Sequence, residues 1–124
     1  MDINTINIIT LAYLGDAIYE VYIREHLIKQ GIAKVEDLTK EATIYVSAKG
    51  QASILKDLMV KNYLTEEELA IIRRGRNNKR NSHPKHTDIV TYKYSTGFEA
   101  LIGYLYLSNK HDRLTEILNQ IEVK

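Results

Sequence analysis

The chain has 124 residues, of which 44% are hydrophobic and 27% charged, and its formal net charge is +1. This length and composition are typical of one soluble globular domain, which we place at residues 1–124. The absence of cysteine excludes disulfides and thiolate zinc sites, and no apolar run approaches the ~20 residues that cross a bilayer, so we expect a cytoplasmic protein without a membrane partner.

Helical periodicity dominates the first half of the chain. Apolar residues recur every three or four positions from 6 to 27, as on one face of an amphipathic helix. Gly31 stands where a glycine that ends a helix is expected, because glycine adopts the left-handed conformation without strain. A second helical region is predicted from 35 to 62, with an optional break near Lys40.

The middle of the chain combines a helix start with a basic segment. Thr65 and Glu68 form a capping box, which predicts a third helix that Gly75 can end. The stretch 77–91 has few apolar residues and the only proline, so we predict a basic loop at about 75–92. Loops of that length are usually functional or disordered.

Basic residues are concentrated in that loop and just before it. From 73 to 85 the chain carries six basic residues and no acid, which leaves 11 basic and 16 acidic residues elsewhere. Cations clustered on an otherwise acidic protein attract a polyanion locally. An ordinary solvated loop also carries charge runs, so the pattern alone favours neither interpretation.

Helical periodicity returns after the loop. A helix is predicted from about 94 to 107, and a last helix, capped by Asp112, follows a break at Asn109. Strand patterns are weak throughout the chain, so the predicted fold class is all-α. The nine tyrosines are expected mostly in core or subunit contacts, because tyrosine combines apolar bulk with a hydroxyl group.

Two acidic residues stand alone in apolar helical segments. Asp16 lies within the first predicted helix, and Glu99 is the only acid between 94 and 107. Burying an unpaired carboxylate costs roughly several kcal/mol, and a divalent cation with oxygen ligands relieves that cost. If the two helices pack together, both carboxylates can converge on one Mg²⁺ ion beside the basic loop, a setting suited to phosphodiester hydrolysis.

Each of these positions also has a purely structural interpretation. Asp16 can face water on an exposed stripe of its helix, and Gly15 can admit either a neighbouring helix or a ligand. Glu20 lies one turn after Asp16 on the same face, where it can act as an auxiliary acid or pair with Arg24 at the surface. The sequence leaves these alternatives open.

Four strings of residues stand in a recognisable order along the chain. They occupy 12–20, 45–49, 69–79 and 92–101, and include Leu14-Gly15-Asp16-Ala17 and Phe98-Glu99-Ala100-Leu101. Together they resemble the catalytic domain of the ribonuclease III family, and most closely its short bacterial branch, Mini-ribonuclease III. The resemblance implies a homodimeric helical bundle that cuts double-stranded RNA with Mg²⁺, with Asp16 and Glu99 as metal-binding and catalytic residues.

The resemblance implies further properties and one open question. The branch lacks a separate double-stranded-RNA-binding domain, leaves 5′-phosphate and 3′-hydroxyl ends, and is associated with maturation of large-subunit ribosomal RNA. Two acids of the wider family pattern are replaced here by Ala12 and Thr96. We therefore expect a single Mg²⁺ or a weakly held second ion. The alternative is a catalytically silent RNA-binding or assembly protein on the same scaffold.

Binding of an RNA duplex then has to come from basic residues of the catalytic domain itself. Double-stranded RNA is recognised through phosphates and 2′-hydroxyls with little base reading. Lys49 can serve either RNA or the subunit interface, and His83 is a weaker candidate than the cations. The residues that we assign to RNA contacts are Arg74, Arg76, Lys79, Arg80, Lys85, His86 and Lys49.

Overall fold

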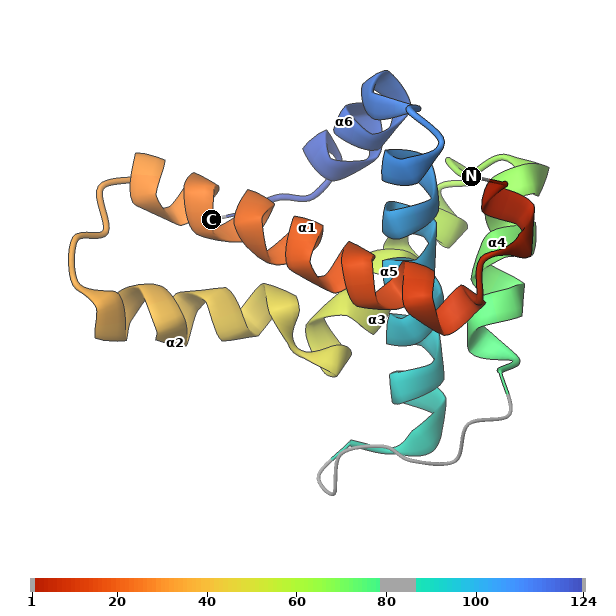
Figure 1. Ribbon diagram of the computed structural model, residues 1–124. Helices are drawn as coiled ribbons and strands as arrows, with labels where there is room; N and C mark the ends of the chain where they lie inside the picture. The colour runs from red at the N-terminus through yellow and green to blue at the C-terminus, as the bar shows by residue number, and fades with distance from the viewer. Residues whose placement is uncertain (1, 79–86, 124) are drawn as a thin grey trace.

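A computed structural model describes residues 2–78 and 87–123, which pack around one central helix (Figure 1). The described residues contain no strand, so the predicted all-α class is confirmed. None of the described helices combines the length and the apolar character that crossing a bilayer requires. The elements are a short 3₁₀ helix η1 (Ile3–Thr5), α1 (Ile8–Lys29), α2 (Val35–Val46), α3 (Ala48–Val60), α4 (Glu66–Arg76), α5 (Ile89–Leu107) and α6 (His111–Asn119).

Two helix ends form as the sequence predicts. Beyond the end of α1, Gly31 has a φ of 93°, in the left-handed region that favours glycine. At the start of α4, the Glu68 N–H donates to the Thr65 hydroxyl oxygen at 3.2 Å, and the Thr65 N–H donates to the Glu68 carboxylate at 2.9 Å. The capping box therefore satisfies two backbone donors that the helix itself leaves unpaired.

The predicted break in the second helical region is wrong in position. The helical region is interrupted at Ser47 and not near Lys40. The Ser47 hydroxyl oxygen accepts a hydrogen bond from the Gly50 N–H at 3.1 Å and thereby caps a new helix, α3. Gly50 also lets the junction close tightly, since a Cβ atom there would lie 2.1 Å from the Ile44 carbonyl oxygen.

The predicted loop at about 75–92 is too long at both ends. Gly75 lies inside α4, and α5 begins at Ile89 because Asp88 caps it, accepting hydrogen bonds from the Thr91 N–H and hydroxyl at 2.8 Å each. Asp112 also differs from its predicted role, since it lies in the first turn of α6 and not at its N-cap.

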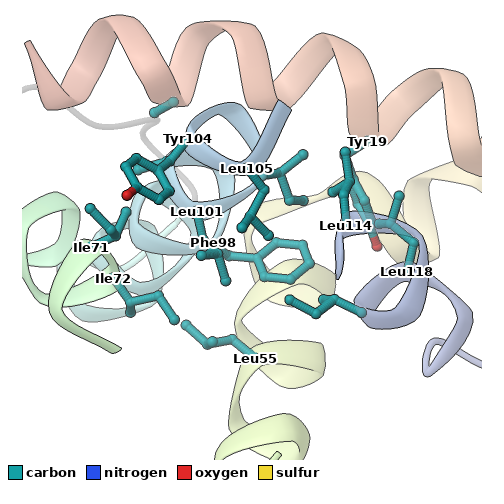
Figure 2. Close-up of a cluster of buried hydrophobic side chains, with 14 of the residues drawn as sticks. Tyr19, Leu55, Ile71, Ile72, Phe98, Leu101, Tyr104, Leu105, Leu114 and Leu118 are labelled. Atoms are coloured by element: carbon teal, nitrogen blue, oxygen red, sulfur yellow. The ribbon is translucent and has the colours of Figure 1, made fainter. Parts of the chain in front are cut away.

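The core surrounds α5, whose residues from 95 to 105 are buried except for a half-buried Glu99. Figure 2 shows side chains from α1, α3, α4 and α6 gathered around Phe98, which is fully buried. The Tyr19 ring meets Phe98 edge-on with 5.3 Å between centroids, and its hydroxyl donates to the Tyr45 carbonyl at 2.9 Å. These contacts fix α1 and α5 against each other at the turns that carry the two isolated acids.

Glycines allow α5 to touch its neighbours backbone to backbone. A Cβ atom on Gly15 would lie 1.8 Å from the Glu99 carbonyl oxygen, and one on Gly103 would lie 2.0 Å from the Leu11 carbonyl oxygen. At the crossing of α4 and α5, a Cβ atom on Gly75 would lie 2.8 Å from the Gly97 Cα. Gly15 therefore admits a neighbouring helix, and this contact brings the residue after it close to Glu99.

Candidate active site

Asp16 and Glu99 meet at the crossing of α1 and α5, although they are far apart in the sequence. Both line one pocket of about 160 Å³, bounded by α1, the end of α4 and the first half of α5. Glu99 is half-buried, whereas Asp16 is exposed, which is one of the two alternatives that the sequence left open for Asp16. The exposed carboxylate stands at the mouth of the pocket, beside a carboxylate that lies deeper.

The environment of Glu99 favours its protonated form when no cation is present. Burial raises the pKa of Glu99, and a hydrogen bond with Asp16 and repulsion from its charge raise it further, to about 8. Glu20 adds a smaller repulsion, and a hydrogen bond from Gln51 acts in the opposite direction. In the pocket without a cation Glu99 therefore holds a proton at neutral pH, and a cation that binds to its carboxylate has to displace that proton.

Glu20 forms the surface ion pair that the sequence offered as one alternative. The Arg24 Nη2 donates to the Glu20 Oε2 at 2.9 Å, and both side chains are more than a third exposed. Such an exposed pair contributes only about 0.2–1 kcal/mol to stability. Glu20 does not line the pocket, so its role as an auxiliary acid stays a prediction.

Gln51, at the start of α3, is the site residue that sequence reasoning missed. It is 2% exposed, and its Nε2 donates to the Glu99 Oε2 at 3.3 Å and to the Val46 carbonyl at 3.1 Å. A signal was present in the sequence, because Gln51 is one turn before Leu55 and two turns before Leu58 on the buried face of α3. A polar residue on such a face needs a partner inside the protein.

The two positions where the wider family pattern has acids also line the pocket. Ala12 supplies only a methyl group, and Thr96 is buried with its hydroxyl donating to the Tyr92 carbonyl at 3.0 Å. Within the described residues no group of three or more His, Cys, Asp or Glu could hold a metal ion. Two carboxylates fit Mg²⁺, which takes one or two such ligands and completes its shell with water and phosphate oxygens.

The basic candidates divide into those that the structure describes and those outside the described residues. Arg74 is exposed near the end of α4, and Arg76 lies 5.7 Å from the centroid of the Tyr94 ring. Lys93, which sequence reasoning also missed, lines the pocket itself, and Lys49 is exposed at the start of α3. The candidates that lie outside the described residues are Lys79, Arg80, His83, Lys85 and His86.

Comparison with known proteins places this fold and this pocket in a family. Residues 9–110 match the Ribonuclease III domain family. The chain is 47% identical over 118 residues to Mini-ribonuclease 3 of Enterococcus faecalis, covering 95% of this chain and 89% of that protein. It is 51% identical over 119 residues to Mini-ribonuclease 3 of Brevibacillus brevis, covering 96% and 87%.

A solved structure supports the same relationship at the level of the fold. The crystal structure of a Fusobacterium nucleatum protein superposes with a TM-score of 0.84 and 35% sequence identity. The match covers 95% of this chain and 93% of that one. The similarity therefore extends over all the helices that form the pocket, and not over one motif alone.

Proposed function

The chain belongs to the ribonuclease III family and to its Mini-ribonuclease 3 branch, and we propose that this endoribonuclease hydrolyses double-stranded RNA with Mg²⁺. The observation that carries the proposal is the meeting of Asp16 and Glu99 in one pocket that Lys93 also lines. The residues proposed to hold Mg²⁺ are these two carboxylates. When bound there, Mg²⁺ polarises a phosphate oxygen and makes a water molecule more acidic.

The reaction proposed at this pocket is phosphodiester hydrolysis. The oxygen of a water molecule bonds to phosphorus, the bond from phosphorus to the 3′ oxygen breaks, and that oxygen leaves with a proton. The products are a 5′-phosphate and a 3′-hydroxyl end. Asp16, at the mouth of the pocket, is exposed to arriving RNA, whereas Glu99 is held from behind by Gln51. Lys93 and the arginines of α4 provide positive charge for the flanking phosphates.

The proposed cellular substrate is the precursor of large-subunit ribosomal RNA, whose duplex ends require trimming in the cytoplasm. Support for a duplex comes from the arrangement of charge, because Arg74 and Arg76 flank Gly75, which lines the pocket at the end of α4. Arginines contact phosphates of any sequence, which suits the recognition of an RNA helix by its shape. Lys79, Arg80, Lys85 and His86 stay proposed RNA contacts on the basis of sequence alone.

We further propose that a second copy of the chain covers the groove between α1 and α2. The groove is lined mainly by apolar side chains, and Ile28 and Val35 on its walls are 58% and 74% exposed. A contiguous apolar groove that is exposed to solvent is typical of an interaction surface, whereas a single exposed apolar residue is not. Glu20 and Arg24 at the groove carry opposite charges, so each can face its opposite on an identical surface related by a two-fold axis. Two pockets related by a dimer axis would cut opposite strands.

Replacing Ile28 and Val35 together with glutamate is expected to convert a dimer into a folded monomer. Neither side chain contributes much to the core of a single subunit, whereas charges in an apolar interface lose hydration without gaining a partner. Light scattering coupled to gel filtration would measure the mass, and circular dichroism the helix content. Val60→Glu is the matched control, because Val60 is 86% exposed on α3. A wild-type monomer, or an unchanged mass in the double variant, would reject this interface.

The function is tested with purified protein and a long perfect RNA duplex, with and without Mg²⁺. Cleavage is expected only with Mg²⁺, and Asp16→Asn is expected to lower its rate by roughly 10³-fold or more, because the amide carries no charge for a cation. The Asp16 side chain is exposed, so the variant should fold normally. Undiminished cutting by Asp16→Asn would reject the assignment, and an absence of products at any enzyme concentration would reject the activity.

A further inference from the structure

Gln51 is held rigidly in a place where its amide can act on only one acid. Its own N–H donates to the Ser47 carbonyl at 2.9 Å in the first turn of α3. The tight junction at Gly50 fixes that turn against the end of α2. The side chain is 98% buried by this packing, and its Nε2 is shared between the Val46 carbonyl and the Glu99 carboxylate. The amide therefore cannot turn away to water.

The Val46 carbonyl determines which end of the amide faces Glu99. A carbonyl oxygen can only accept a hydrogen bond, so the NH₂ group of Gln51 and not its oxygen must lie toward Val46. The same NH₂ group then supplies its second N–H to Glu99. The orientation follows from an acceptor that is independent of the acids in the pocket.

This orientation leaves the other end of the amide without a partner. The Oε1 of Gln51 is buried, and no hydrogen-bond donor reaches it within the described residues. An unsatisfied buried polar atom destabilises the folded state, so stability alone would favour an apolar side chain at this position. A functional role at the pocket would explain why a destabilising polar side chain is present at this buried position.

We propose that Gln51 is a positioning residue, which fixes the Oε2 atom of Glu99 and thereby presents the remaining carboxylate oxygen to a cation shared with Asp16. An amide suits this task because it is neutral. A lysine or arginine in its place would neutralise Glu99 and repel Mg²⁺, whereas an amide orients the carboxylate and leaves its charge available. The inference rests on the proposed function, because it requires Glu99 to be a cation ligand.

Gln51→Met is the variant that tests the inference, since methionine keeps the unbranched shape and removes both N–H donors. Loss of a residue that orients a metal ligand typically lowers metal affinity or activity by about 10–100-fold. We therefore expect the Mg²⁺ concentration for half-maximal cleavage to rise about tenfold or more. The rise in the unfolding temperature on adding Mg²⁺ should shrink in parallel, and this readout needs no catalysis.

Two comparisons separate a positioning role from a structural one. Arg113→Met breaks a partly buried ion pair outside the pocket, in which Arg113 Nε donates to the Glu68 Oε2 at 2.7 Å. It should lower the unfolding temperature without changing the Mg²⁺ requirement. In a Glu99→Gln background, Gln51→Met should have no further effect on the response of the unfolding temperature to Mg²⁺. Gln51→Leu repeats the test with a second shape if the methionine variant folds poorly.

Each outcome has a definite meaning. A Gln51→Met protein with the wild-type Mg²⁺ requirement and the wild-type gain in unfolding temperature would overturn the inference. The same result together with an inactive Glu99→Gln would leave the proposed function intact. Full cleavage by Glu99→Gln would instead overturn the proposed function. A further loss of Mg²⁺ response from Gln51→Met in the Glu99→Gln background would show that Gln51 does not act through Glu99.

Discussion

Replacing Glu99 with glutamine is expected to lower RNA cleavage by roughly 10³-fold and to make the metal-free protein more stable at neutral pH. The two effects have one cause. In the metal-free pocket, burial and the neighbouring Asp16 raise the pKa of Glu99 to about 8, well above the ordinary value of 4.5. An uncharged glutamine escapes that penalty but supplies no charge to a cation.

The sign of the pH dependence follows from this raised pKa. Between about pH 4.5 and pH 8 the unfolded chain has lost the proton of Glu99 while the folded chain still holds it. The folded state then binds more protons, so its stability falls as the pH rises through this interval. The glutamine variant does not titrate, so it should be more stable than wild type at pH 8, where most of this penalty on Glu99 is present.

Thermal unfolding from pH 5 to pH 9, in a chelator and then in Mg²⁺, measures these differences. Mg²⁺ should stabilise the wild type, and Glu99→Gln by much less, because Asp16 alone then remains to hold the cation. Because a cation has to displace the proton, the Mg²⁺ concentration for half-maximal cleavage should rise as the pH falls below 8. Glu20→Gln is the matched comparison, since its carboxylate is already paired with Arg24 and its loss should change stability little. A Glu99→Gln protein less stable than wild type in chelator at pH 8 contradicts this account.

The helices could be predicted from the sequence where local chemistry decides them. Thr65 and Glu68 accept hydrogen bonds from each other's backbone N–H groups within one turn, so their motif predicts a helix start in any fold. The start of α5 was missed because Ile89, Val90 and Thr91 are β-branched, a weak helix signal. Asp88 overrides that preference by capping them, and its side chain was the available signal.

The acid pair could be predicted, but its surroundings could not. Asp16 and Glu99 each stand out in one segment of sequence as a charge among apolar residues. The sequence left open whether Asp16 is buried or faces water, and the structure places it on an exposed side of α1, where Tyr13 and Val21 are 82% and 64% exposed. Gln51 carries no charge, so its contact with Glu99 across α3 and α5 could not be predicted from its own segment of sequence. That kind of information exists only once the helices are packed.

Gly15→Ala is expected to destabilise the protein and to lower cleavage more than the loss of folded protein explains. The added methyl group would lie 1.8 Å from the Glu99 carbonyl oxygen and 2.9 Å from the Gly103 backbone nitrogen, so α1 and α5 have to separate. Overpacking a core typically costs about 1–3 kcal/mol and occasionally more. Because the methyl group would contact rigid backbone, we expect a cost at the upper end of this range. The gain of about 1 kcal/mol in helix propensity from glycine to alanine offsets only part of it.

The effect on cleavage follows from what the crossing of α1 and α5 positions. Asp16 is the next residue on α1, and Glu99 is the residue whose backbone the methyl group would displace, so the variant changes the separation of the two carboxylates directly. Misplacement of a reacting group by about 1 Å can cost on the order of 10²-fold in rate. Urea unfolding gives the stability loss, and cleavage measured at a temperature where the variant is fully folded gives the rate.

Gly75→Ala provides the graded comparison for Gly15→Ala. Its methyl group would lie 2.8 Å from the Gly97 Cα at the crossing of α4 and α5, a milder overlap. We expect a smaller loss of stability there, because a smaller displacement of the helices relieves it. If the two variants lose stability equally, or if fully folded Gly15→Ala cuts RNA at the wild-type rate, then the close approach of α1 to α5 does not set the geometry of the acid pair.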